Sequence, residues 1–191
     1  MTLTELSLAC RTYRRFTQEA VPQELIAMML ENARISNSAR NAQPLRYAAV
    51  CAPETVAAMQ PLVHWAASLP REIGTPKEGE QPTAFIVACT EGRDTPWTGI
   101  DLGIAVRTMT LTACEGGVGS CIMGAVEFDR VKELLALPET WTPRLVIALG
   151  YPDHASCIVP LPEDGSTSYY VNEDRDYFVP KRSAEDVILW R

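Results

Sequence analysis

Residues Ala84 to Cys89 (Ala-Phe-Ile-Val-Ala-Cys) form an unbroken apolar run that constrains the fold more than any other part of the sequence. A strand whose residues are all apolar has no polar face for solvent, so it must be covered on both sides. Leu145 to Leu149 is a second apolar run of this kind. At 191 residues, the chain has the size of one domain. We therefore expect a single α/β domain over residues 1–191, with helices on both faces of a sheet.

Apolar periodicity and breaking residues indicate five helices and one further strand. The helices are expected from Thr4 to Ala9, Pro22 to Ala33, Pro53 to Ala67, Ile100 to Glu115 and Val131 to Leu137, and the strand from Tyr47 to Cys51. Prolines and glycines predict a long surface loop from Pro70 to Pro82. Asp153 to Pro180 is polar and is expected to be irregular, and Val187 to Trp190 is expected to be extended.

Charge and cysteine usage exclude several functions. The 17 basic and 24 acidic side chains give a net charge of −7, which argues against nucleic acid or an anionic membrane as a partner. No apolar run is long enough for a membrane span, and the first fifteen residues lack the pattern of a secretory signal. The six cysteines form no CxxC pair, so we expect neither a metal site nor secretion, but free thiols in a reducing cytoplasm.

Three arginines within five residues, Arg11, Arg14 and Arg15, stand out in this acidic chain. They follow a short helix, where cations are favourable in their own right because they complement the helix dipole. Guanidinium groups also match phosphate oxygens and stay charged at every physiological pH. The cluster is therefore either a helix-end arrangement or an anion site.

Two further segments combine flexible backbone with polar side chains. Ser36 to Tyr47 is rich in hydroxyl, amide and guanidinium groups, which suits a ligand with a polyhydroxyl or phosphate tail but also a plain connection. Gly116 to Gly124 lacks the lysine of a phosphate-binding P-loop, and no strand precedes it as a dinucleotide fingerprint requires. Its glycines could end a helix or let backbone N–H groups approach a flat ligand closely.

Five motifs in order resemble the nitroreductase family of FMN-dependent oxidoreductases, and the resemblance extends from about Leu6 to Ile188. The motifs are Arg11-Thr12-Tyr13-Arg14-Arg15-Phe16, Ser38-Ala39-Arg40-Asn41-Ala42-Gln43-Pro44-Leu45, Asp101-Leu102-Gly103-Ile104-Ala105, Gly117-Val118-Gly119-Ser120 and Ala148-Leu149-Gly150-Tyr151-Pro152. The chain departs from the family pattern in three places. Cys10 stands where the family has its first arginine, Arg40 replaces a small residue, and Leu45 replaces a tryptophan.

The resemblance implies an FMN site made from four parts of the sequence. It assigns FMN contacts to Arg11, Thr12 and Arg14 near the start, to Cys121, Met123 and Gly124 along the flavin ring, and to Lys181 and Arg182 at the phosphate. It also implies that Asn37, Ser38 and Asn41 reach the FMN of the other subunit of a homodimer. The backbone N–H near Met123 would address the flavin N5.

The implied fold is a three-layer α/β/α sandwich with a mixed, mostly antiparallel sheet and a C-terminal arm that reaches the partner subunit. The implied activity moves a hydride from NAD(P)H to an electron-poor acceptor such as a nitroaromatic or quinone, in two steps. Flavin performs this chemistry itself, so no catalytic side chain or metal is expected. Two alternatives stay open: a flavin-binding or scavenging protein with little turnover, and a specialised flavin enzyme of the same fold.

The expected helix from Ile100 to Glu115 gives a separate reason to expect a homodimer. It is apolar on most sides, and one small sheet can cover only part of it. A large interface between two subunits would bury the remainder, which would make the cofactor sites composite.

Overall fold

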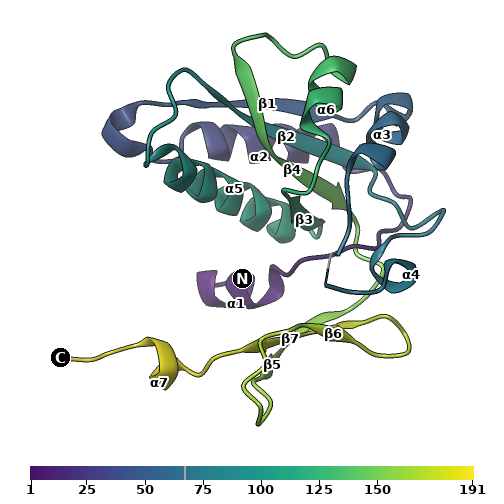
Figure 1. The fold of residues 1–191 in the computed structure, drawn as a ribbon, viewed down its shortest axis with the longest axis vertical. Helices are drawn as coiled ribbons and strands as arrows, with labels where there is room; N and C mark the ends of the chain where they lie inside the picture. Colours follow the sequence, from purple (N-terminus) through teal and green to yellow (C-terminus); the bar gives the residue numbers. More distant parts are fainter. Residues whose placement is uncertain (67) are drawn as a thin grey trace.

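A four-stranded antiparallel sheet lies at the centre of the computed structural model, which describes residues 1–66 and 68–191 (Figure 1). Its strands, in spatial order, are β1 (Leu45–Val50), β2 (Ala84–Glu91), β4 (Trp141–Gly150) and β3 (Gly119–Met123). Every residue from Ala84 to Cys89 is at most 2% exposed. The prediction of a strand covered on both faces is confirmed.

Helices cover both faces of this sheet, because alternate β2 side chains point to opposite sides. On one face, α2 (Gln23–Arg34) and α5 (Thr98–Glu115) pack against Ile86 and Ala88. On the other face, α3 (Pro53–Met59) and α6 (Phe128–Leu134) pack against Phe85 and Val87. The structure is therefore the three-layer α/β/α sandwich that the sequence predicts (Figure 1).

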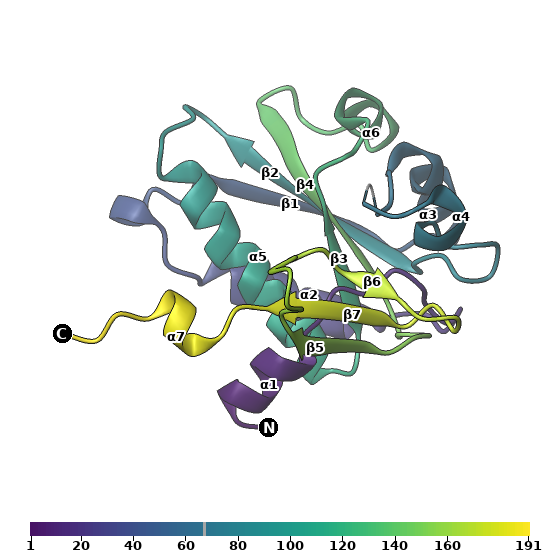
Figure 2. The ribbon, with the colours of Figure 1, turned by 60° about the horizontal axis from the view of Figure 1, so that its bottom comes forward.

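A small second sheet lies beside α1 (Leu3–Ala9), away from the central sheet (Figures 1 and 2). It has the order β5 (Ser156–Pro160), β7 (Tyr177–Lys181), β6 (Tyr170–Val171); β5 and β7 are parallel, and β6 and β7 are antiparallel. The prediction that residues 153–180 are irregular is wrong for these strands. Each long strand contains a proline and pairs with a segment distant in sequence, so local propensity does not reveal it.

The segment after β7 extends away from the body of the protomer. It forms the single turn α7 (Ala184–Val187) and continues without regular structure, so only its last part is extended as expected (Figure 2). In the sandwich itself the pairing is wholly antiparallel, and the parallel pair that makes the protein mixed lies in the small sheet.

Several element boundaries differ from the sequence expectations for local reasons. Thr2, rather than Thr4, caps α1, because its side chain and that of Glu5 bond reciprocally to backbone N–H groups. The helix from Pro53 ends at Met59 and continues only as the 3₁₀ turn η2 (Gln60–Leu62); Ala67 lies outside the described residues. The predicted loop from Pro70 to Pro82 includes one helical turn, α4 (Arg71–Gly74).

The remaining elements match their predicted positions within a few residues: β1, α2, α5, α6 and β4. Within the described ranges, no helix combines the length and apolar character that crossing a membrane requires.

Candidate functional site

The arginine-rich segment from Cys10 to Phe16 is held between the two sheets. The N–H of Tyr13 donates to the Ser120 carbonyl of β3 at 2.9 Å, and the N–H of Phe16 donates to the Glu80 carbonyl at 2.9 Å. Phe16 is fully buried against Gly150, where an added Cβ would lie 2.8 Å from the Phe16 ring. The segment is therefore fixed on both sides of Arg14.

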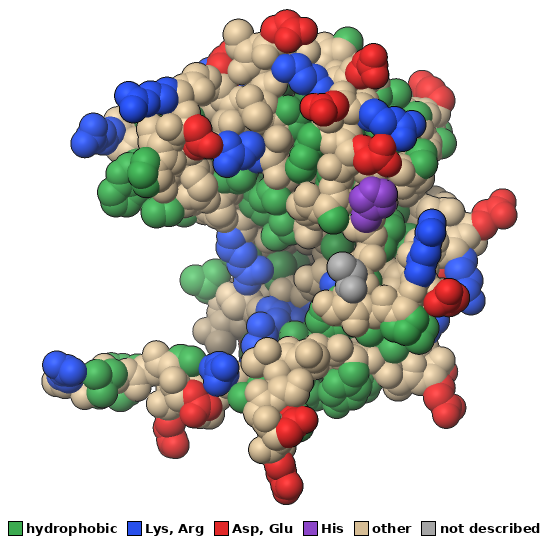
Figure 3. Space-filling view, viewed as in Figure 1, with side chains coloured by type: hydrophobic (Ala, Val, Ile, Leu, Met, Phe, Trp, Pro, Cys, Tyr) green, Lys and Arg blue, Asp and Glu red, His purple; other side chains and the backbone are tan. Residues whose placement is uncertain are grey.

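These arginines lie on a pocket of about 360 Å³ between the central sheet and the small sheet. Its lining residues come from the segment after α1, from α5, from β3 and from the region of β6 and β7: Cys10, Arg11, Thr12, Arg14, Arg107, Thr110, Ser120, Ile122, Tyr169, Val179 and Lys181. Four of them are basic and none is acidic. In the space-filling view, a deep hollow with basic side chains separates the main body from the layer that contains the C-terminal segment (Figure 3). The pocket has the charge of an anion site.

Arg14 is the most constrained cation of the pocket. Its guanidinium carbon lies 4.8 Å from the ring centroids of both Tyr169 and Tyr177, which is cation–π distance. Its Nε is buried and has no hydrogen-bond partner among the described residues. A buried donor without a partner is costly, so this orientation favours a ligand that accepts the hydrogen bond.

His154 positions the backbone of Arg14. Its Nε2 accepts a 3.0 Å hydrogen bond from the Arg14 N–H, so Nδ1 carries the proton and donates to the Ala155 carbonyl at 2.9 Å. The imidazole lies between Tyr13 and Tyr177, with centroid distances of 5.2 and 4.9 Å. Burial lowers its pKa, and the nearby positive charges of Arg15 and Arg14 act in the same direction. The histidine is therefore held neutral.

Arg11 and Lys181 carry further positive charge. Arg11 donates from Nη2 to the Ser7 carbonyl at 2.7 Å, while its Nε is buried without a partner. Lys181 is exposed at the end of β7. Among residues 1–66 and 68–191, neither residue forms an ion pair, and neither does Arg14. The positive charge of the pocket is thus not neutralised by carboxylates of the described chain.

The glycine-rich segment forms strand β3. Successive side chains of a strand point to opposite faces, and this decides which of them face the pocket. The side chains of Cys121 and Met123 point into the core and are 6% and 4% exposed. Burial raises the pKa of Cys121 to about 11. Ser120 and Ile122 line the pocket instead. The side chains of Cys121 and Met123 thus face away from the pocket, and the period of two in a strand is the signal for Ile122. The backbone groups of Cys121 and Met123 face the paired strand β4.

The free edge of β3 offers backbone donors. The Ser120 carbonyl faces this edge, because it accepts from Tyr13. Backbone groups of alternate strand residues face the same side, so the N–H of Ile122 also faces this edge. Gly124 is exposed just after the strand, and a Cβ there would meet only ordinary van der Waals contact, 3.8 Å from Leu145.

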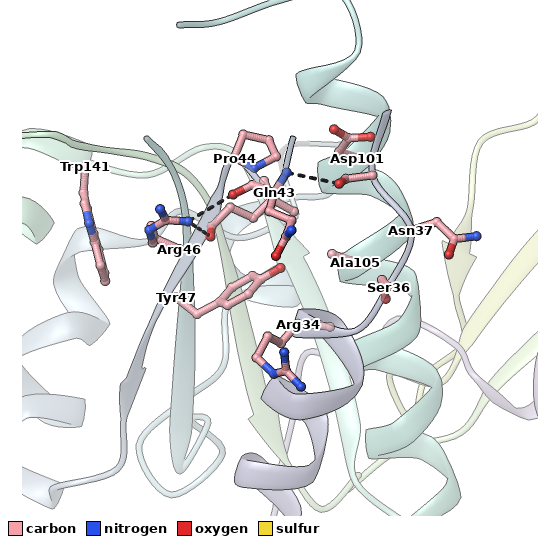
Figure 4. Close-up of a pocket in the computed structure, with 13 residues that line it drawn as sticks. Arg34, Ser36, Asn37, Gln43, Pro44, Arg46, Tyr47, Asp101, Ala105 and Trp141 are labelled. Atoms are coloured by element: carbon pink, nitrogen blue, oxygen red, sulfur yellow. Dashed lines mark hydrogen bonds between the residues drawn. The ribbon is translucent and has the colours of Figure 1, made fainter. Parts of the chain in front are cut away.

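The polar turn before β1 forms a separate pocket of about 340 Å³ (Figure 4). Asn37 and Ser38 line it with Asp101, which is 3% exposed and accepts from the Ala39 N–H at 2.9 Å. Asn37 projects away from Tyr47 and Gln43 (Figure 4). Within the part of the chain that the structure describes, no residue lines both this pocket and the basic pocket. One chain therefore does not bring the turn to Arg11 and Arg14.

The turn is also strained. Arg40, Asn41 and Gln43 have φ values of 56°, 53° and 49°, in the left-handed region that residues other than glycine rarely adopt. Asn41 lies exposed in the 3₁₀ turn η1 (Ala39–Asn41). Such strain persists where the surrounding structure enforces it, and it clusters at functional sites.

Two differences from the sequence analysis concern cations. Arg182 lies with Lys181 on another surface pocket, beside Asp186, and does not line the basic pocket. Arg107 of α5 lines the basic pocket and was not among the expected site residues. The available signal was its isolation, because it is the single basic residue between Thr98 and Glu115.

Together, the fold and the pocket define a three-layer α/β protein with a basic pocket between the edge of its central sheet and a C-terminal layer. The family model described as the nitroreductase family matches residues 9–151. The chain belongs to the nitroreductase family, a family of oxidoreductases.

Solved structures share the fold at low sequence identity. A nitroreductase family protein from Streptococcus pneumoniae TIGR4 has a TM-score of 0.70 and 18% identity over 100% of both chains. One from Clostridium novyi NT has a TM-score of 0.67 and 21% identity over 80% of this chain and 86% of its own. An FMN-dependent nitroreductase from Clostridium difficile R20291 has a TM-score of 0.65 and 18% identity, covering 81% and 90%.

Proposed function

We propose that this protein is an FMN-dependent oxidoreductase that moves a hydride from NAD(P)H to an electron-poor acceptor, such as a nitroaromatic or a quinone, in a two-step cycle. The observation that carries the proposal is the basic pocket, where Arg11, Arg14 and Lys181 meet without a carboxylate. Family membership supports it, as does the likeness to a structure described as an FMN-dependent nitroreductase.

The residues of the pocket fit FMN in charge and in shape. A terminal phosphate carries close to two negative charges, which the guanidinium and ammonium groups balance. The buried Nε atoms of Arg11 and Arg14 lack partners, as expected of donors that serve a ligand. Ile122, Val179 and Tyr169 supply apolar surface for a flat ring. With no dinucleotide fingerprint in the sequence, FMN fits better than FAD or NAD.

Bound FMN would supply the hydride transfer, and the residues of the chain would bind it and balance charge. We assign Arg11, Thr12 and Lys181 to binding. Arg14, held by Tyr169 and Tyr177, would provide a fixed positive charge that stabilises the negative charge of the reduced flavin ring. No side chain is assigned a catalytic role, and Gly124 and Arg182 are assigned only backbone or peripheral contacts. In the segment that contains Cys121 and Met123, the group we assign to the flavin is the N–H of Ile122.

We further propose a homodimer with composite sites. Trp97, the N-cap residue of α5, is 55% exposed, and Ile100 and Ile104 on the helix are 52% and 41% exposed. Trp190 in the C-terminal segment is 87% exposed. Apolar surface of this extent is usual at subunit interfaces. Because Asn37, Ser38 and Asn41 lie apart from the basic pocket, a partner's pocket is where they would reach FMN. All six cysteines are free thiols, which suits a reducing compartment such as the cytoplasm.

An absorbance scan of the purified protein tests the proposal first. A flavin spectrum is expected, and heat-released cofactor should run with FMN rather than FAD. NAD(P)H oxidation should then depend on added nitrofurazone or menadione. A yellow protein whose flavin is not reduced by NAD(P)H would favour a flavin-binding or scavenging protein. A flavin that NAD(P)H reduces but that neither acceptor reoxidises would favour a specialised flavin enzyme. A colourless protein that takes up no FMN would refute the cofactor assignment.

A further inference from the structure

Arg107 is a cation of the basic pocket for which neither the motifs nor the family assignment gives a role. It lies in the middle of α5, an 18-residue helix packed on the central sheet, so its Cα is held rigidly. Its guanidinium has five N–H donors, yet its one hydrogen bond among the described residues goes from Nη1 to the Cys10 Sγ at 3.1 Å. A thiol is a weak acceptor, so most of its donor capacity is unused.

The position of Arg107 on α5 places its unused N–H donors at the basic pocket. Ile100, Ile104 and Arg107 are spaced by four and three residues, so they share one exposed stripe of the helix. Arg107 stands where this apolar stripe meets the pocket that also contains Arg11 and Lys181. It forms no ion pair within residues 1–66 and 68–191. Three cations from three different elements thus surround one space.

Cys10 explains why the guanidinium can reach this space. The thiol is 6% exposed and donates to the Thr110 carbonyl of α5 at 3.4 Å, so the chain at position 10 lies directly against the helix. A long basic side chain at position 10 would compete with Arg107 for the same volume and would repel it. The space beside positions 10 and 107 therefore holds one guanidinium, which an arginine at either of these two positions could place there.

We propose that Arg107 is a phosphate ligand of the pocket, delivering from α5 the positive charge that position 10 lacks. The inference rests on the proposed binding of FMN and deepens it. A ligand of the phosphate contributes to the affinity for FMN but not to the affinity for riboflavin, which has the same ring and ribityl chain without the phosphate. The ratio of the two dissociation constants isolates this contribution.

The experiment titrates the full-length apoprotein with FMN and with riboflavin and follows flavin fluorescence. Arg107→Gln should reduce the preference for FMN over riboflavin by about tenfold or more, as expected for one charge-assisted contact. Arg107→Lys should keep part of the preference. Arg130→Gln is the matched control, because it removes one positive charge from an exposed site on α6 and should change nothing.

A charge relocation sharpens the test. The double variant Cys10→Arg with Arg107→Cys returns a guanidinium to the same space and should recover most of the lost preference. Riboflavin affinity, measured on each sample, reports whether the pocket is still folded, and light scattering reports whether the subunits still associate.

Three outcomes would overturn the inference: an unchanged preference in Arg107→Gln, an equal loss of both flavins, or a loss explained by dissociation of subunits. If the wild-type protein bound neither flavin, the proposed function itself would fail, which is a distinguishable result.

Discussion

Arg175 and Glu80 form a two-point ion pair, with 2.8 and 3.0 Å from the Arg175 Nη1 to the two carboxylate oxygens. Their side chains are only 15% and 20% exposed. Arg175 also donates to the Ile73 and Thr75 carbonyls, and the Glu80 carbonyl accepts from Phe16. The pair therefore fastens the turn between β6 and β7 to the loop that holds the arginine segment.

Glu80→Gln should lower the free energy of unfolding by about 2 kcal/mol or more, because it leaves a largely buried guanidinium without its counter-charge. Glu31→Gln breaks a pair of similar length, Arg34 to Glu31 at 2.7 Å, but with both side chains more than half exposed. Its cost should be clearly smaller than that of Glu80→Gln, because solvent screens an exposed pair. Urea unfolding of both variants measures the two losses in free energy of unfolding. Equal losses would show that the buried pair stabilises the protein no more than the exposed pair does.

Acid should destabilise the protein through His154. Its pKa in the folded state lies below the ordinary value, so the unfolded chain takes up the proton first as the pH falls. The contribution of the neutral imidazole to the free energy of unfolding is fully present above about pH 6.5, the ordinary pKa of histidine. It is lost as the pH falls from there to the pKa of the folded state, and the free energy of unfolding then drops by up to about 1.4 kcal/mol per pH unit. The charged groups that act on the imidazole are Arg14 and Arg15, which lower its pKa, and Asp176, which raises it.

The measurement is urea unfolding at a series of pH values between 7 and 5. His154→Gln should flatten this dependence, whereas His64→Gln, which removes an exposed histidine, should leave it unchanged. A steep dependence that survives in His154→Gln would assign it to other groups.

Arg14→Ala should weaken FMN binding by about 1–3 kcal/mol, because one charge-assisted contact and the two ring contacts are lost. Arg14→Lys should recover only part of this, since an ammonium cannot stack on Tyr169 and Tyr177 as a planar guanidinium does. Fluorescence titration gives both affinities, with Arg71→Ala on the exposed α4 turn as the control. An FMN affinity equal to that of the wild type would remove Arg14 from the site.

Ile104→Asp should dissociate the subunits and release FMN together, because an interface across α5 cannot bury an unpaired carboxylate. Light scattering should give about twice 21.1 kDa for the wild-type protein and about 21.1 kDa for the variant. Leu134→Asp, at a similarly exposed apolar position on α6, should remain dimeric. Deletion of residues 184–191, which keeps Lys181, should also weaken association. A monomer with tight FMN binding would contradict the composite site.

The sequence predicts the sandwich well because its main signals are local. The apolar run in β2 and the 18-residue apolar helix each require burial whatever their neighbours, and α2 follows from helical spacing after Pro22. The small sheet was missed because β5 and β7 are held by pairing between segments about twenty residues apart, with a proline in each. Pairing of this kind can be predicted only once the positions of both strands in the fold are known.

The site was predicted in part for similar reasons. Arg11, Thr12, Arg14 and Lys181 line one pocket, as motif matching suggests. The motif could not say which side chains of β3 point inward, because that depends on the register with β4. It also could not find Arg107, which lines the same pocket and contacts Cys10 across 97 residues of sequence.

The walls of the basic pocket have a consequence for how the protein is made. Arg11 and Arg14 leave the ribosome early, but Tyr169, Tyr177 and Lys181 are synthesised some 160 residues later. The four strands of the sandwich all precede residue 151, so every strand of the central sheet is synthesised before this wall. A chain interrupted before Tyr169 would thus contain every strand of its central sheet and still lack one wall of the basic pocket. Under the proposed function, uptake of FMN would therefore mark chains in which translation has passed residue 181.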